Sequence, residues 1–107
     1  MEAADVIQSY GRILASSEQM LAAAEQSHWD ELVELELGRR QLIAEVTAEP
    51  GPVLGEALRA QKQDLITRTL AMDERVRALT QSWMAELQVI LTSVQAQRKL
   101  NKVYDAG

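Results

Sequence analysis

Few residues in this chain of 107 amino acids could carry chemistry. His28 is the sole histidine and there is no cysteine, so no second imidazole or thiolate is present to complete a zinc site. We therefore expect His28 to be structural or solvent-exposed, and we expect neither a metal nor a cofactor. A disulfide framework is excluded for the same reason.

Two pairs of nearby carboxylates could in principle act as acid and base, namely Glu31 with Glu34 and Asp73 with Glu74. The chain has no G-x-S-x-G nucleophile elbow, no phosphate-binding glycine loop and no H-E-x-x-H motif. A solvated surface is therefore the expected place for these carboxylates. We predict that the protein is not an enzyme and has no catalytic residues.

The amino-acid composition indicates that the chain is built from helices. The chain holds 14 leucines and 15 alanines, no phenylalanine, and only 5 glycines and 2 prolines, a usage that favours helices over strands and turns. This length is sufficient for one core. We predict an all-α fold, with residues 1–107 forming a single helical domain.

Charge and hydropathy exclude several partners. The net charge is −5 and no dense block of Lys and Arg occurs, which argues against nucleic acid as a partner. No apolar run approaches the roughly 20 residues of a bilayer span, and the N-terminus lacks the basic start of a secretory signal. We expect a cytoplasmic protein without a membrane partner. Residues 1–58 carry 11 acids and 3 bases, and residues 59–107 carry 5 acids and 8 bases, so the two halves should attract each other.

Apolar periodicity predicts two helices in the first half of the chain. One stripe, which includes Ser17, recurs at steps of four and three residues and predicts a helix over 3–26. Because the stripe then shifts to a new set that begins with Trp29, the helix must break, and a second helix is predicted over 28–48. Ser27 is the expected N-cap of this second helix. Within it, the side chains expected to have structural roles at the margin of the core are Trp29, Leu32 and the ion pair of Glu36 with Arg40.

A long third helix is predicted over 53–104. The segment Glu49-Pro50-Gly51-Pro52 must end the second helix, and no proline interrupts the chain after it. At about 1.5 Å per residue the third helix would extend about 75 Å, against about 30 to 35 Å for each of the others. The long helix must therefore bend or break near residue 92, or leave part of its apolar stripe for another chain to bury.

The apolar side of the third helix is the candidate partner-binding face. A surface rich in Met and Trp is a common way to accept an amphipathic segment, and packing under the first two helices is the alternative. Near the C-terminus, Arg98, Lys99 and Lys102 form a small basic cluster that we attribute to the helix dipole. The residues assigned to the partner-binding face are Met72, Val76, Leu79, Trp83, Leu87 and Ile90.

The order of several short motifs resembles the flagellar export chaperone FliT family, and the similarity covers most of the chain. The matching segments are His28-Trp29-Asp30-Glu31-Leu32 leading to Glu36 and Arg39-Arg40, the D-x-x-V-x-x-L run of Asp73, Val76 and Leu79, Met84-x-Glu86-Leu87, and the stretch from Lys99 to Tyr104.

This resemblance implies a small antiparallel helical bundle in which two shorter helices pack on one long helix. It also implies a cytoplasmic chaperone that binds the C-terminal segment of the filament cap protein FliD, prevents its premature assembly, and delivers it to the flagellar export gate and ATPase complex. Enteric members also restrain the master regulator FlhDC. This sequence ends soon after Tyr104, where those members have a further regulatory helix, which argues against self-inhibition and the transcriptional role.

Two other functions stay open. A structural helical protein would bury the surplus stripe by forming a homodimer. An antagonist of a flagellar transcription activator would bind its regulator without needing FliD.

Overall fold

A computed structural model of the chain describes residues 2–48 and 51–106, with side chains described through residue 102. It contains three helices, α1 (Ala3–Glu25), α2 (Trp29–Thr47) and α3 (Glu56–Ala106), and no strand among the described residues. The prediction of an all-α fold is confirmed. The expected helix stop at Pro50 lies outside the described residues, as does the side chain of Tyr104.

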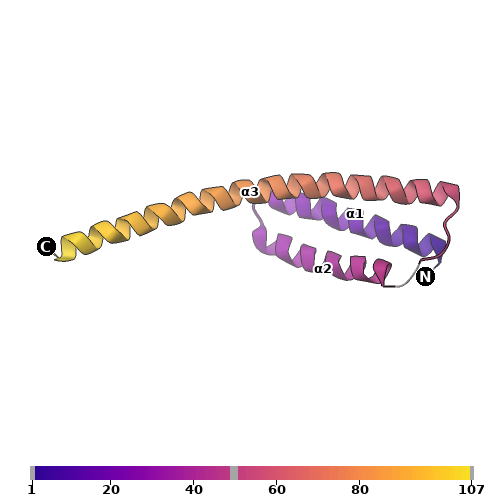
Figure 1. The fold of residues 1–107 in the computed structure, drawn as a ribbon, viewed down its shortest axis with the longest axis horizontal. Helices are drawn as coiled ribbons and strands as arrows, with labels where there is room; N and C mark the ends of the chain where they lie inside the picture. The colour runs from indigo at the N-terminus through magenta and orange to yellow at the C-terminus, as the bar shows by residue number, and fades with distance from the viewer. Residues whose placement is uncertain (1, 49–50, 107) are drawn as a thin grey trace. The chain divides into compact units, whose positions relative to one another are not determined.

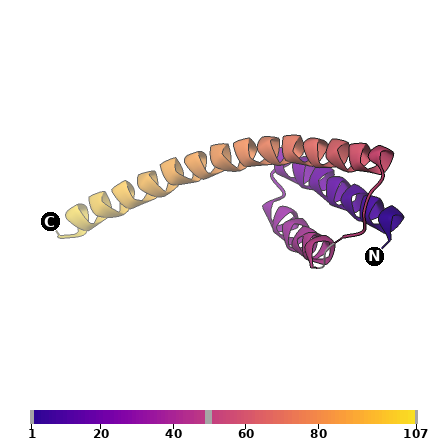
Figure 2. The same cartoon turned by 45° about the vertical axis from the view of Figure 1, so that its right-hand side comes forward.

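The chain divides into two compact units, residues 1–77 and residues 78–107. In the first unit, α2 runs antiparallel to α1, and the first part of α3 runs antiparallel to α2 (Figures 1 and 2). Lys62 on α3 places its Nζ atom 5.4 Å from the ring centroid of Tyr10 on α1, a cation–π contact between these helices. The first unit is therefore a bundle of three helical segments.

Helix α1 supplies most of the core. It begins after Glu2, whose backbone N–H donates to the carboxylate of Asp5 at 3.2 Å. The buried side chains recur at the three- and four-residue steps of one helix face, which is the stripe that the sequence predicts. From α2 and α3 only Leu32 and Val76 join them among the described residues. The buried residues of α1 are Val6, Ile13, Leu14, Ser17, Met20, Leu21, Ala23 and Ala24.

The turn between α1 and α2 differs from the prediction. Ser27 adopts a left-handed conformation with φ of 59°, and His28 is the N-cap, without a side-chain cap bond. The backbone N–H of Ser27 donates to Ala24 O, and that of His28 donates to Ala23 O at 2.8 Å. These two bonds form a Schellman closure of α1. The predicted N-cap role of Ser27 is therefore wrong, because its backbone ends α1 and its hydroxyl does not begin α2.

Helix α3 begins at Glu56, three residues after its predicted start, and continues without interruption through Thr92 and Ser93. The break considered near residue 92 is absent. No helix in the described part of the chain is long and apolar enough to cross a membrane. Residues 78–102 of α3 contain no fully buried side chain, so the apolar residues of the second unit are exposed or half-buried.

Candidate partner-binding face

The residues considered for acid and base chemistry do not form a catalytic group. His28 is exposed, and its Nδ1 atom lies 3.6 Å from Glu31 Oε2. Asp73 pairs with Arg39, and Glu74 pairs with Arg77 one turn away. Among the described residues, no three His, Asp or Glu side chains lie close enough to hold a metal ion.

Arg39 links all three helices of the first unit. Its Nη1 atom donates to the hydroxyl of Ser17 on α1 at 2.9 Å and to the carboxylate of Asp73 on α3. Ser17 is fully buried and donates to the carbonyl of Ile13 at 2.9 Å, so both capacities of its hydroxyl are used. The side chains of Arg39 and Asp73 are 15% and 35% exposed, which makes this a partly desolvated ion pair.

Sequence reasoning missed this link. It placed Ser17 on the apolar stripe, left Asp73 on the surface, and assigned the structural ion pair to Arg40. A serine in the middle of an apolar stripe is a signal, since a buried hydroxyl needs a partner from another element. Nothing in the sequence alone distinguishes Arg39 from Arg40 as that partner.

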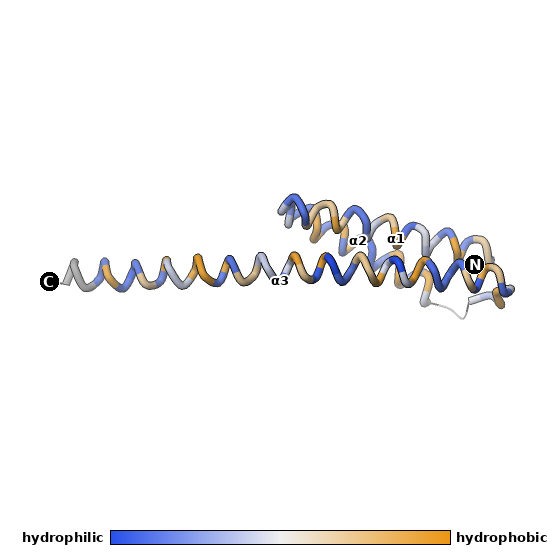
Figure 3. The backbone as a smooth tube through the Cα atoms, turned by 90° about the horizontal axis from the view of Figure 1, so that it is seen from above, coloured by the Kyte–Doolittle hydropathy of each residue, from blue (hydrophilic) through white to orange (hydrophobic). Residues whose placement is uncertain are grey.

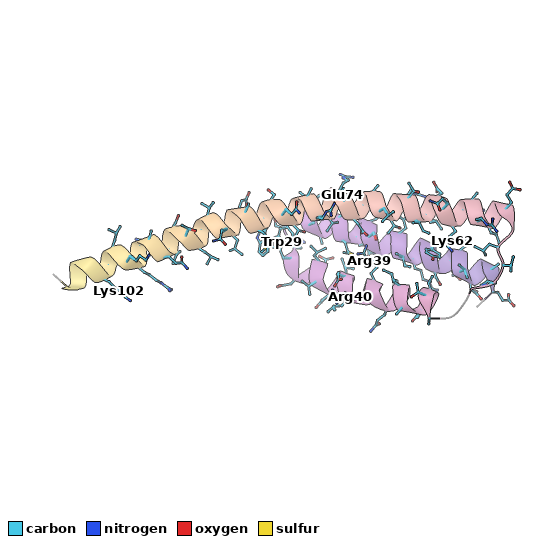
Figure 4. All side chains as sticks on the ribbon, viewed as in Figure 1. Trp29, Arg39, Arg40, Lys62, Glu74 and Lys102 are labelled. Carbon is cyan, nitrogen blue, oxygen red and sulfur yellow. The ribbon has the colours of Figure 1, made fainter. Side chains whose placement is uncertain are left out.

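The residues assigned to structural roles on α2 occupy different environments. Leu32 is buried and Trp29 is half-buried. Glu36 and Arg40 form the expected ion pair, with 2.5 Å between Arg40 Nε and Glu36 Oε1, and Arg40 is 70% exposed. Figure 4 labels Trp29, Arg39 and Arg40 along α2. Because the Arg40 pair is largely in water, it contributes much less to stability than the Arg39 link.

A pocket of about 270 Å³ opens among α1, α2 and the first part of α3. Its charged residues, Arg39 and Asp73, are already paired with each other. The pocket therefore presents mainly apolar surface, unlike a catalytic cleft, in which titratable groups converge. The lining residues are Tyr10, Ile13, Arg39, Ile43, Val46, Thr47, Ile66, Thr69, Leu70 and Asp73.

The six residues assigned to the partner-binding face divide between the two units. Met72 and Val76 lie in the first unit, where Met72 is half-buried and Val76 is 8% exposed, so Val76 belongs to the core. The other four lie in the second unit. Ile90 is exposed there, and the half-buried residues are Leu79, Trp83 and Leu87.

Within the second unit, these four residues share one side of α3 with others that are not among the six assigned residues. Successive residues of a helix are about 100° apart, so residues four apart in sequence are separated by only about 40° around the helix. Leu91 follows Leu87 and Val94 follows Ile90 at this spacing, which places both on the same side of α3. Both are exposed, as is Met84 at the margin of the stripe. Figure 3 shows apolar residues, in orange, recurring along this part of α3. We call the set Leu79, Trp83, Leu87, Ile90, Leu91 and Val94 the apolar stripe.

The fold belongs to the class of small all-α helical bundles, and comparison with known proteins narrows this class to one family. The family model of flagellar protein FliT matches residues 7–106. The chain therefore belongs to the FliT family, whose members have a flagellar role.

Individual relatives agree with the family match. Flagellar protein FliT of Photorhabdus laumondii is 27% identical over 101 residues, covering 94% of this chain and 81% of the relative. FliT of Enterobacter sp. strain 638 is 24% identical over 98 residues, covering 92% and 82%. A crystal structure of FliT from Bordetella bronchiseptica has a TM-score of 0.74 and 35% identity, covering 79% of this chain and 97% of that chain.

Proposed function

We propose that this protein is a cytoplasmic flagellar export chaperone that binds the filament cap protein FliD through the apolar stripe. By covering the C-terminal segment of FliD it would prevent premature assembly, and it would deliver FliD to the export gate and ATPase complex. Binding needs no covalent chemistry, so the protein acts without catalysis. Membership of the FliT family supports the flagellar context of this proposal.

The observation that carries the proposal is the exposure of the apolar stripe. Ile90, Leu91 and Val94 are 58%, 47% and 41% exposed on one side of α3. Burying such surface contributes about 25 cal/mol per Å², less the entropy lost by the client when it becomes ordered. An amphipathic helix laid along the stripe would bury these side chains, which is a recurrent mode of peptide recognition.

Isothermal titration of FliD from the same organism against two matched variants tests the site. Ile90→Asp places a charge on the stripe, and we expect it to weaken binding at least about tenfold, because the carboxylate would have to lose its water. Val89→Asp, on the adjacent residue, is the control. Val89 is 67% exposed and lies about 120° around the helix from Trp83 and about 160° from Leu87, outside the stripe, so this change should leave the affinity nearly unchanged.

A third variant tests the aromatic residue of the stripe. Trp83→Ala should weaken FliD binding by more than about 1 kcal/mol, because aromatic anchors dominate interface energies. Helicity by circular dichroism should stay near that of the parent protein. Equal affinities for the parent protein, Ile90→Asp and Trp83→Ala would contradict the proposed site.

Self-association is the second candidate function, and the same exposed stripe supports it. Light scattering decides between the two. A tight dimer that binds no FliD at micromolar concentration would favour a structural role, whereas a monomer or weak dimer that binds FliD would favour the chaperone. Restraint of FlhDC is not part of the proposal.

A further inference from the structure

The segment that carries the apolar stripe is almost without charge. Between Arg77 and Arg98 the chain has 20 residues with a single charged side chain, Glu86. The described remainder of the second unit is strongly basic, since Arg98, Lys99 and Lys102 are all exposed. An apolar surface with one acidic residue, Glu86, therefore adjoins a compact positive one on the same helix.

Contacts among the side chains that the structure describes do not explain the basic cluster. Lys102 lies three and four residues after Lys99 and Arg98, a spacing at which like charges disfavour a helix. Within the described part of the chain, none of the three bases forms an ion pair. The expected interaction of these bases with the helix dipole is also weak. Helix α3 continues to Ala106, and its last turn, where that interaction is strongest, contains no base.

We infer that the client segment carries two or more acidic residues immediately beyond its apolar residues, at the end that meets Arg98, Lys99 and Lys102. This inference rests on the proposed chaperone function and adds the charge and orientation of the bound segment. Apolar contact along the stripe supplies most of the affinity, while the charges direct which end of the segment lies at residue 98.

Charge complementarity favours such a segment over a second copy of this chain. Parallel pairing of two α3 helices would bring the three bases of one copy against those of the other. Antiparallel pairing centred on the stripe would place the two Glu86 side chains near each other, because Glu86 lies about 20° around the helix from Leu79. Each arrangement opposes like charges, whereas acidic residues placed beside Arg98, Lys99 and Lys102 would oppose unlike ones.

Salt dependence of FliD binding tests the inference. The variant R98Q/K99Q/K102Q removes three positive charges while keeping good helix formers. At about 50 mM salt we expect it to bind roughly tenfold more weakly than the parent protein, and at about 500 mM the two should differ less than about threefold, because screening weakens exposed ion pairs. The matched control Q81A/Q88A/Q95A changes three exposed glutamines of the same helix without altering its charge, and we expect it to retain the salt dependence of the parent protein.

The outcomes separate this inference from the chaperone proposal. If the triple glutamine variant binds FliD with the affinity of the parent protein at both salt concentrations while Ile90→Asp still weakens binding, the acidic flank is refuted and the apolar site survives. If Ile90→Asp has no effect, the chaperone site itself fails. Stronger binding of the parent protein to vesicles of anionic lipid than to FliD would also overturn the inference, because the bases would then face a membrane.

A charge exchange tests the direct contact. R98E/K99E/K102E should lose more affinity than the glutamine variant at low salt. Replacing the acidic residues that flank the apolar C-terminal segment of FliD with lysine should restore at least half of the affinity that the glutamate variant loses. Absence of acidic residues from that flank, or absence of rescue, would refute the inference.

Discussion

At the scale of single residues, two neighbouring arginines on α2 illustrate how burial decides the strength of an ion pair. Arg39 contacts Ser17 and Asp73 from inside the bundle, while Arg40 pairs with Glu36 in water. When a partly desolvated charge loses its partner, few water molecules can reach it to take the partner's place, so the loss is destabilising. An exposed charge that loses its partner is solvated by water at once. The two residues should therefore differ greatly in their effect on stability.

We predict that Arg39→Met lowers the free energy of unfolding by about 2 to 3 kcal/mol, since it leaves the carboxylate of Asp73 and the hydroxyl of Ser17 without their partner. Arg40→Met should lower it by less than about 0.5 kcal/mol. Urea denaturation followed by circular dichroism measures both. Equal effects of the two substitutions would contradict the central role of Arg39.

The left-handed residue at the α1–α2 turn gives a second prediction at this scale. Ser27 has φ of 59°, a conformation that costs a residue with a Cβ atom about 1 kcal/mol. Ser27→Gly should therefore raise the stability by up to about 1 kcal/mol, even though glycine also increases the entropy of the unfolded chain. Ser16→Gly within α1 is the control and should be destabilising. Thermal denaturation compares the two, and a loss of stability in Ser27→Gly would show that the side chain matters more than the backbone.

At the scale of elements, α1 and α2 differ in how much they depend on packing. Helix α1 places eight residues in the core, while α2 contributes only Leu32 among the described residues and has a glycine in its interior. Gly38 is exposed, and a Cβ atom added there meets no neighbour within 4 Å. Intrinsic helix propensity should therefore have a measurable effect on α2.

We predict that Gly38→Ala stabilises the protein by about 0.5 to 1 kcal/mol, because alanine reduces the backbone entropy lost when the helix forms. The reverse change on the same helix, Ala44→Gly, should destabilise it by a similar amount. Denaturant midpoints of the two variants should move in opposite directions. No change in either variant would mean that α2 is already frayed in the native state.

At the scale of the whole molecule, the core is confined to one of the two units. Every buried residue in the described part of the chain lies between Val6 and Val76. The interhelical contacts of Arg39, Lys62 and Arg75 also belong to residues 1–77. We therefore expect the first unit to fold without residues 78–107.

We predict that a chain of residues 1–77 unfolds cooperatively on heating, with the far-ultraviolet circular dichroism of a helical protein. The complementary deletion, residues 26–107, lacks α1 and with it most of the buried side chains, and it should show no cooperative transition. FliD binding should be lost from residues 1–77 under the proposed function. A gradual, non-cooperative melt of residues 1–77 would contradict the independence of the first unit.

The sequence by itself determined the three helices and the all-α class. Apolar periodicity, alanine and leucine content, and the Pro-Gly-Pro segment act over a few residues, so they can be interpreted without tertiary contacts. The stripe of α1 from Val6 to Ala24 was predictable in the same way. The Ser27 turn was not, because an uninterrupted run of polar residues can close a helix through either a side-chain cap or a left-handed backbone.

Only the tertiary structure decided which arginine reaches across the bundle, that Val76 is buried, and that Leu91 and Val94 are exposed beside Ile90. Sequence analysis left Leu91 and Val94 out of the partner-binding face and assigned Val76 to it. These outcomes depend on the rotation of each helix about its axis and on which side chains of other helices pack against it. A helical period specifies that one side is apolar, but burial of that side also requires a facing element, which residues far away in the chain must provide.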